Sequence, residues 1–163
     1  MATLAPLLDA APLVQLHAGA ALVSVVLGPF VLFRRSRDRW HRVGGYVWIS
    51  AMAVVALSSF GIRTFAVVGP FGPIHLLSAY TLVMLALGLR AALQRRIEAH
   101  RRTMQGMYVW ALGVAGLFTL LPGRVMHHVV FGADTALGFG LLVVSLALIW
   151  AGLRLRGRLG NTL

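Results

Sequence analysis

Residues 13–42 read LVQLHAGAALVSVVLGPFVLFRRSRDRWHR, a long apolar run that ends in a cluster of arginines. An uncharged run of this length matches the hydrocarbon thickness of a bilayer when it is helical. The one histidine inside the run is His17. The stretch therefore predicts a membrane-spanning helix that carries a single ionisable side chain and ends at a charged loop.

Similar apolar runs recur along the whole chain. They place spans at about residues 11–33, 42–62, 73–92, 102–121 and 135–153, with Pro73 suited to a first helical turn. The 163 residues are 59% hydrophobic and 12% charged, and their mean hydropathy is +0.84. These values lie far from those of soluble domains. We expect an all-α integral membrane protein, with residues 1–163 forming one membrane domain of five transmembrane helices.

The basic residues give the expected orientation. All fifteen are arginines, and thirteen of them lie in the segments 34–42, 90–102 and 154–158. Because short cytoplasmic loops are enriched in arginine, we expect the N-terminus outside and the C-terminus in the cytoplasm. The net charge of +11 is confined to these loops, so it predicts contact with the lipid bilayer and its anionic headgroups, and no nucleic-acid partner.

Two kinds of residue are absent where their presence would be informative. The sequence contains no cysteine, which rules out disulfides, iron–sulfur clusters and covalently attached c-type haem. Residues 1–13 contain no basic side chain, unlike the start of a cleaved signal peptide, so the first span is expected to remain in the protein.

The histidines suggest an internal repeat. His75 lies 58 residues after His17, each at the start of an apolar run, and His100 lies 59 residues after His41, each beside arginines. The tripeptide Tyr46-Val47-Trp48 recurs as Tyr108-Val109-Trp110. The pattern predicts two parallel helical-hairpin repeats, residues 14–66 and 72–125, which form a four-helix bundle with a fifth helix added.

This layout is suited to haem. A b-type haem with two protein ligands needs imidazoles from facing helices on its two faces. His17 with His75 would hold a haem near the outer surface, and His41 with His100 would hold one near the inner surface. Haem propionates need cationic partners in a membrane. The arginines placed to neutralise them are Arg63 and Arg124 outside, and Arg42 and Arg101 inside.

The residues thus predict a membrane b-type cytochrome that binds one or two haems and exchanges electrons with a quinol or a soluble redox partner. Two alternatives stay open. In the first alternative, the chain is a cofactor-free accessory or structural subunit, and the histidines beside its arginines are simply solvated. Its partners would be a larger inner-membrane complex or further copies of the chain in a homo-oligomer. In the second alternative, the chain binds a metal on the outer side through His17, His75, His127 and His128.

Several segments resemble a known family. They are Leu16-His17 to Gly28-Pro29-Phe30, His41-Arg42-Val43-Gly44, Ala99-His100-Arg101-Arg102, GPFGPIHLLS at residues 69–78 and LPGRVMH at residues 121–127. They resemble the bacterial membrane proteins classified as domain of unknown function 2306. The resemblance implies a small integral protein of the bacterial inner membrane and lends no mechanism.

One residue departs from that family pattern. Relatives tend to carry histidine where this chain has Arg63, which puts the propionate role of Arg63 in question. The plan of four helices with two histidines near each surface is also similar to that of two-haem transmembrane cytochromes, a likeness of architecture alone.

Overall fold

The computed structural model describes residues 3–62, 72–132, 136, 140 and 143–144, and it forms two compact units. One unit is Ala10–Ala115, and the other combines Met1–Asp9 with Gly116–Leu163. Every secondary-structure element within the described residues is helical. The first unit holds four predicted histidine ligands, and its helices determine how those side chains are placed.

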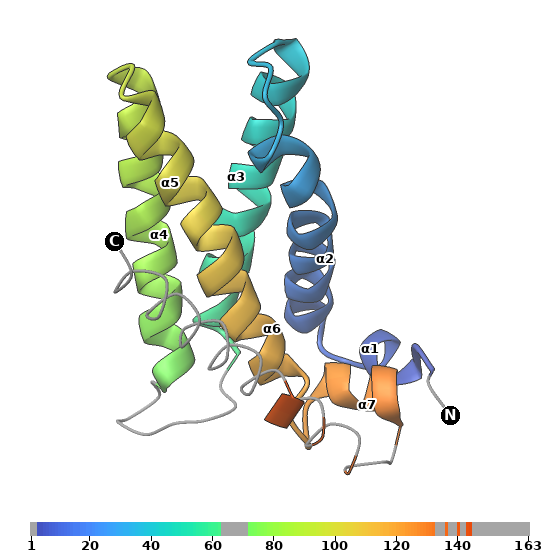
Figure 1. Ribbon diagram of the computed structural model, residues 1–163. Helices are drawn as coiled ribbons and strands as arrows, with labels where there is room; N and C mark the ends of the chain where they lie inside the picture. Colours follow the sequence, from blue (N-terminus) through green and yellow to red (C-terminus); the bar gives the residue numbers. More distant parts are fainter. Residues whose placement is uncertain (1–2, 63–71, 133–135, 137–139, 141–142, 145–163) are drawn as a thin grey trace, which may run out of the picture. The chain divides into compact units, whose positions relative to one another are not determined.

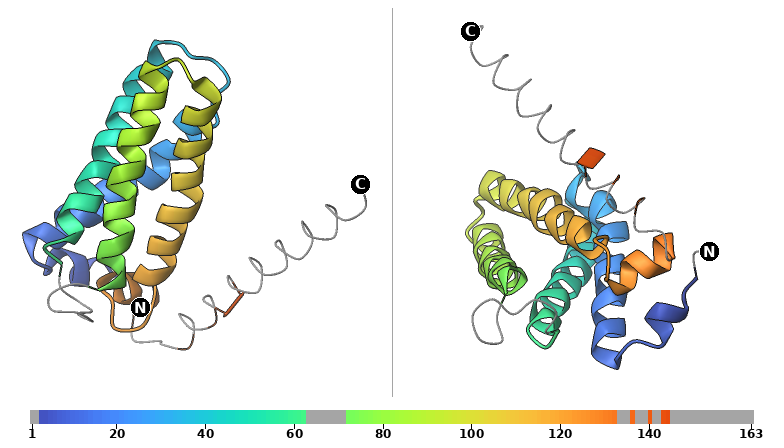
Figure 2. Two further views of the ribbon diagram at one scale, coloured as in Figure 1. Left: turned by 90° about the vertical axis from the view of Figure 1, so that its left-hand side faces the viewer. Right: turned by 90° about the horizontal axis from the view of Figure 1, so that it is seen from below.

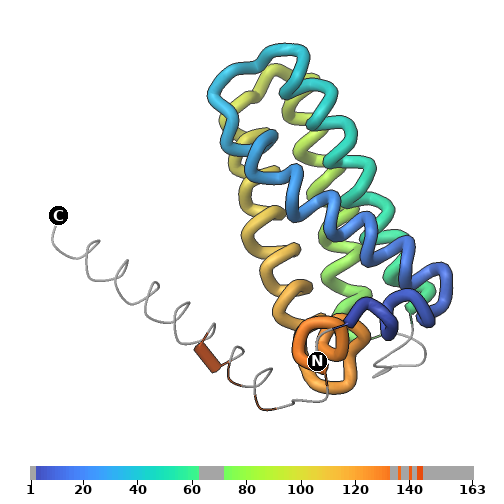
Figure 3. Tube along the Cα trace, turned by 90° about the vertical axis from the view of Figure 1, so that its right-hand side faces the viewer, coloured from blue at the N-terminus to red at the C-terminus, as the bar shows by residue number. Residues whose placement is uncertain are grey.

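The helices of the first unit are α2 (Pro12–Leu32), α3 (Arg39–Ser59), α4 (Pro73–Leu93), α5 (Ile97–Met107) and the π-helical turn η1 (Tyr108–Leu112). Each helix packs against the next one in the chain, and α5 and η1 also contact α2. Helices α2, α3, α4 and α5 therefore lie side by side, each running opposite to the one before it, and η1 continues from the end of α5 (Figure 1, Figure 2 and Figure 3).

The expectation that this is a helical membrane protein is confirmed, but the number of five spans is not. α2, α3 and α4 are each long and apolar enough to cross a membrane. The fourth predicted span, residues 102–121, is divided among α5, η1 and the following α6 (Gly113–Thr119). The fifth, residues 135–153, lies outside the described residues except for isolated positions.

Local chemistry explains where two of the helices begin. α4 begins at Pro73, as predicted, because the missing N–H of proline costs nothing in a first turn. α3 begins at Arg39, three residues before the predicted 42. The cause is Asp38, whose Oδ1 accepts the backbone N–H of His41 at 3.0 Å and caps the helix. Arg34 forms an ion pair with the same carboxylate.

Small polar groups lie inside the first unit, and many large apolar side chains lie on its surface. Phe30, Leu57 and Leu76 are 71%, 60% and 76% exposed, which suits hydrocarbon rather than water. Between helices, the Ser59 and Ser78 hydroxyls share a hydrogen bond. Close packing of small and polar residues is typical of helices that associate in lipid. The buried polar residues of this unit are Ser24, Ser58, Ser59, His75, Ser78 and Thr81.

An apolar cluster fills the middle of the first unit. It consists of Trp48, Met52, Leu85, Met104 and Met107, all at most 5% exposed. We call the end where α2 and α4 finish the arginine end, and the end where they begin the serine end. The cluster separates the histidines of one end from those of the other.

The second unit contains the short helices α1 (Ala5–Leu8) and α7 (Val125–Phe131), which contact each other. A turn at Gly123, with φ of +81°, precedes α7. Glycine adopts this conformation readily because it has no Cβ.

Candidate functional site

Each of the four predicted ligands in the first unit lies on the inward-facing stripe of its helix. His17 lies 7 residues before Ser24 and 11 before Gly28, both buried. On α3, His41 has the same spacing to Trp48 and Met52, also buried. Because 7 and 11 residues are close to whole numbers of helical turns, these side chains share one face.

The stripes of α4 and α5 follow the same rule. His75 is itself buried, at 4% exposed. His100 lies 4 and 7 residues before the buried Met104 and Met107. All four rings are therefore turned toward neighbouring helices rather than toward lipid, which is the orientation that a cofactor ligand needs.

At the arginine end, His41 and His100 make equivalent hydrogen bonds. The Nδ1 of His41 is 3.1 Å from the carbonyl oxygen of Val31, and the Nδ1 of His100 is 2.9 Å from that of Gly88. A carbonyl only accepts, so in the neutral form of each ring Nδ1 carries the proton and Nε2 keeps a lone pair. A neutral imidazole held in this way is the form that binds metals and haem iron.

At the serine end, His17 has the same tautomer for another reason. Its Nδ1 lies 2.8 Å from the Ser58 Oγ, and that hydroxyl donates to the Val54 carbonyl at 2.6 Å. Since the single proton of the hydroxyl is committed, the ring of His17 must be the donor. Its Nε2 therefore keeps the lone pair.

His75 is held differently. Its Nδ1 accepts the backbone N–H of Gly72 at 3.0 Å, an interaction that caps the start of α4. The proton of the neutral ring is therefore on Nε2, the atom that would have to bind iron. The ring also packs beside Phe60, with 5.7 Å between ring centroids. The two ends of the unit are thus not chemically equivalent, although the sequence pattern is nearly symmetric.

The predicted propionate partners fall into three groups. Arg63 lies outside the described residues. Arg42 and Arg101 are exposed at the arginine end, and Arg101 pairs with Glu98 at 3.3 Å. Arg124 belongs to the second unit, where its guanidinium lies over the Phe118 ring at 4.7 Å. Burial lowers the pKa of Arg124 below its ordinary value.

The predicted outer metal ligands are divided between the two units. His127 and His128 belong to the second unit, where their Nδ1 atoms bond to the carbonyls of Leu120 and Gly132. His127 is fully buried and His128 is exposed. Among the described residues, no group of three or more His, Cys, Asp or Glu side chains is placed to share a metal ion. The outer metal site stays a prediction.

The repeated tripeptides have different environments. Trp48 is 1% exposed and Tyr46 is 59% exposed, whereas Trp110 is 53% exposed. With His41 aligned to His100, the equivalent of Trp48 is Met107, which is 1% exposed. The matching letters of the two tripeptides therefore do not mark equivalent positions, while the histidines and their carbonyl bonds do.

Sequence reasoning missed the contact that brings η1 against α2. The Tyr108 hydroxyl donates to the Val25 carbonyl at 3.0 Å, and a Cβ added at Gly28 would overlap the Tyr108 ring. Trp48 Nε1–H donates to the Ser24 carbonyl at 3.0 Å on the same stretch of α2. In the sequence, Gly28 beside Pro29 is the signal that could have pointed to this contact.

One comparison with known proteins found a match. The family model described as Predicted membrane protein (DUF2306) matches residues 14–151 of this chain. No curated protein and no solved structure matches it.

Proposed function

We propose that this chain, which belongs to the family Predicted membrane protein (DUF2306), is a membrane-embedded electron carrier that binds b-type haem between His41 and His100. The observation that supports the proposal is their matched hydrogen bonding. Each ring lies on an inward stripe, and each donates Nδ1–H to a helix carbonyl. Both Nε2 lone pairs are thereby available to iron.

The haem would supply a one-electron couple at an iron without an open coordination position. The protein's own residues orient the two rings, which are part-buried. Arg42 and Arg101 follow the two ligands directly in the sequence, at the polar surface, where planar guanidinium groups can pair with propionates. Such pairing removes the cost of placing carboxylates near hydrocarbon.

The serine end supports a second haem less well. His17 has a suitable tautomer, but His75 uses its Nδ1 lone pair to accept from Gly72. Binding iron through the Nε2 of His75 would require that bond to be given up and α4 to lose its cap. We therefore propose one haem at the arginine end as the basic form, with His17 and His75 as a second pair only when this cap is released.

The proposal includes the full membrane architecture. Five transmembrane helices, two parallel hairpins with a fifth helix, would cross a bacterial inner membrane with the N-terminus outside. The arginine end would then face the cytoplasm, where short loops rich in arginine are retained. A haem there would exchange electrons with a quinol in the bilayer or with a soluble partner.

An absorption spectrum tests the proposal directly. The full chain is expressed with added haem and purified in detergent, and its oxidised and reduced spectra are recorded. A Soret band with the sharp α and β bands of a low-spin, six-coordinate haem b is the expected result. Monodisperse, helical protein without a Soret band would refute haem binding. Metal analysis of the same sample tests the outer metal alternative.

Asparagine variants identify the ligands. The amide of asparagine can replace the Nδ1–H of histidine, so His41→Asn and His100→Asn can keep their carbonyl bonds but cannot bind iron. We expect both variants to fold and to lose the six-coordinate spectrum. His128→Asn, a change at an exposed histidine of the other unit, is the control and should leave the spectrum unchanged.

A cofactor-free subunit is the second candidate, and one observation favours it. The carbonyl bonds of His41 and His100 already tie each hairpin together, and the apolar cluster already fills the centre of the unit. If the chain is a cofactor-free subunit, the asparagine variants of His41 and His100 would keep all properties of the wild type. Co-purification with other membrane subunits would then be the relevant readout.

A further inference from the structure

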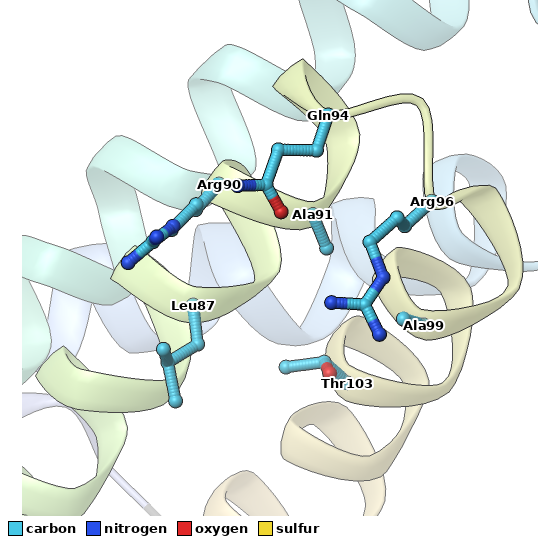
Figure 4. Close-up of a pocket in the computed structure, with 7 residues that line it drawn as sticks. All are labelled: Leu87, Arg90, Ala91, Gln94, Arg96, Ala99 and Thr103. Carbon is cyan, nitrogen blue, oxygen red and sulfur yellow. The ribbon is translucent and has the colours of Figure 1, made fainter.

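A groove lies at the arginine end, between the last turn of α4 and the first turns of α5. Its volume is about 380 Å³. Figure 4 shows its lining side chains, which come from both helices and from the turn that joins them. They are Leu87, Arg90, Ala91, Gln94, Arg96, Ala99 and Thr103.

Two guanidinium groups of the groove lack acidic partners among the described residues. In the part of the chain that the structure describes, Arg34 pairs with Asp38, and Arg101 and Arg102 pair with Glu98. Arg90 and Arg96 take part in none of them. Glu98, the nearest acidic residue in sequence, is already shared by two other arginines. The groove therefore has a local excess of positive charge, which favours an anionic ligand.

The turn between the helices fixes Arg96 beside the end of α4. The Arg96 backbone N–H donates to the Ala91 carbonyl at 2.8 Å, and the preceding Arg95 has a φ of 60°. The chain therefore reverses within a few residues. In Figure 4 the Arg96 side chain extends from the start of α5 back along the groove, toward Thr103.

The groove also has an apolar side. Leu87 lies one turn before Arg90, toward the middle of a helix able to cross a membrane, and it is 50% exposed. Ala91 and Ala99 are small and leave space between the helices. The groove is thus positively charged at the end of the membrane helix and apolar on the side toward the middle of that helix. An anionic phospholipid has the same order of groups, a phosphate followed by acyl chains.

We infer that this groove is a binding site for an anionic phospholipid, with its phosphate between Arg90 and Arg96. The planar guanidinium groups suit bidentate bonds to phosphate oxygens. The Gln94 amide and the Thr103 hydroxyl supply further donors. One acyl chain lies along Leu87. The inference is independent of haem binding, because none of these residues belongs to the proposed haem site.

Native mass spectrometry of the full chain tests the site. The detergent-solubilised protein is titrated with phosphatidylglycerol, with phosphatidylcholine and with glycerol 1-phosphate. Phosphatidylglycerol is expected to bind in preference to both. Equal binding of phosphatidylcholine would overturn the inference, because the charge of the headgroup would then not matter. Equal binding of glycerol 1-phosphate would replace the lipid by a free phosphate ester.

Matched variants separate this groove from general attraction to a cationic surface. Arg90→Gln and Arg96→Gln should each lower the apparent affinity for phosphatidylglycerol by about tenfold, the effect of losing one charged hydrogen bond. Arg37→Gln removes the same charge from an exposed residue outside the groove, and it should change little. An equal loss in Arg37→Gln would show diffuse attraction and refute the site.

Folding is checked in the same samples by circular dichroism and size-exclusion chromatography. Arg96→Lys keeps the charge but loses the planar fork. It should bind with an affinity between those of wild type and Arg96→Gln. If Arg96→Gln fails to fold, Arg96→Lys and Arg90→Gln carry the test, and unchanged lipid affinity in both would refute the proposal.

Discussion

The His41 ring closes the end of the preceding helix by donating its Nδ1–H to the Val31 carbonyl at 3.1 Å. Val31 is in the last turn of α2, where carbonyl groups have no partner within the helix. The bond therefore satisfies a buried acceptor and ties α3 to α2. The same geometry orients the Nε2 of His41, so stability and ligand orientation depend on one contact.

This contact predicts different effects for two substitutions of His41. His41→Ala leaves the Val31 carbonyl unsatisfied and should lower the free energy of unfolding by about 1 kcal/mol. His41→Asn keeps a donor and should lose less. Thermal unfolding in detergent, with both variants purified without haem, provides the comparison. Equal stability of the two variants would mean that the bond contributes nothing.

Gly28→Ala should destabilise the first unit. The added Cβ would overlap the Tyr108 ring, so the ring or the helix must move, at a cost of about 1–3 kcal/mol. Gly19→Ala is the matched control, because a Cβ at Gly19 meets nothing within 4 Å. Melting temperatures of the two variants decide the matter. If the ring is the obstacle, Tyr108→Ala in the Gly28→Ala background should remove most of the added loss.

The two repeated tryptophans should respond differently to phenylalanine. Trp48→Phe removes a donor to the Ser24 carbonyl and leaves space in the core, and it should cost about 1–3 kcal/mol. Trp110→Phe changes an exposed side chain and should be nearly neutral. Denaturation in mixed detergent measures both. Similar losses would contradict the different environments of the two tripeptides.

Asp38 gives the stability of the first unit a dependence on low pH. The Arg34 guanidinium and the His41 backbone N–H donate to this carboxylate and hold its pKa below the ordinary value. A lowered pKa contributes stability that is complete above the unfolded-state pKa of about 3.9 and is lost as pH falls through the folded-state pKa.

Asp38→Asn tests this dependence. Asparagine still caps a helix but carries no charge. The difference in melting temperature between wild type and Asp38→Asn should therefore be constant at pH values more than about one unit above the unfolded-state pKa of about 3.9, and it should shrink below about pH 4. A difference that is independent of pH would show that the ionised carboxylate has no role.

Arg95→Gly should stabilise the turn between α4 and α5. Arg95 has a φ of 60°, and a side chain in this left-handed conformation costs about 1 kcal/mol that glycine avoids. Arg95→Gln removes the same charge without relieving the backbone and serves as the control. A higher melting temperature for Arg95→Gly than for Arg95→Gln is the expected result.

The sequence was informative where long-range patterns determine the outcome. Apolar runs bounded by arginines predict α2, α3 and α4 to within a few residues, because the membrane fixes the length of such helices. The inward orientation of the four histidines also follows, since the buried stripe repeats with the helical period. The start of α3 was placed too late because the cap depends on one side chain, Asp38.

Other features depend on three-dimensional contacts that leave no clear pattern. The π-helical turn η1 interrupts the fourth predicted span, and composition gives no warning of one extra residue in a helical turn. The tautomer of His75 is set by the backbone N–H of Gly72. Nothing in the spacing of the histidines distinguishes it from His17, so the chemical difference between the two ends was unforeseen.

The serines and glycines that face inward have a consequence for engineering. The interior combines these small residues with the apolar cluster around Trp48 and Met52, while large side chains such as Phe30 and Leu76 remain on the outer surface. A water-soluble analogue could therefore be designed by replacing exterior apolar residues with charged ones and copying the interior unchanged. In such an analogue the histidine geometry would become accessible to spectroscopy without detergent.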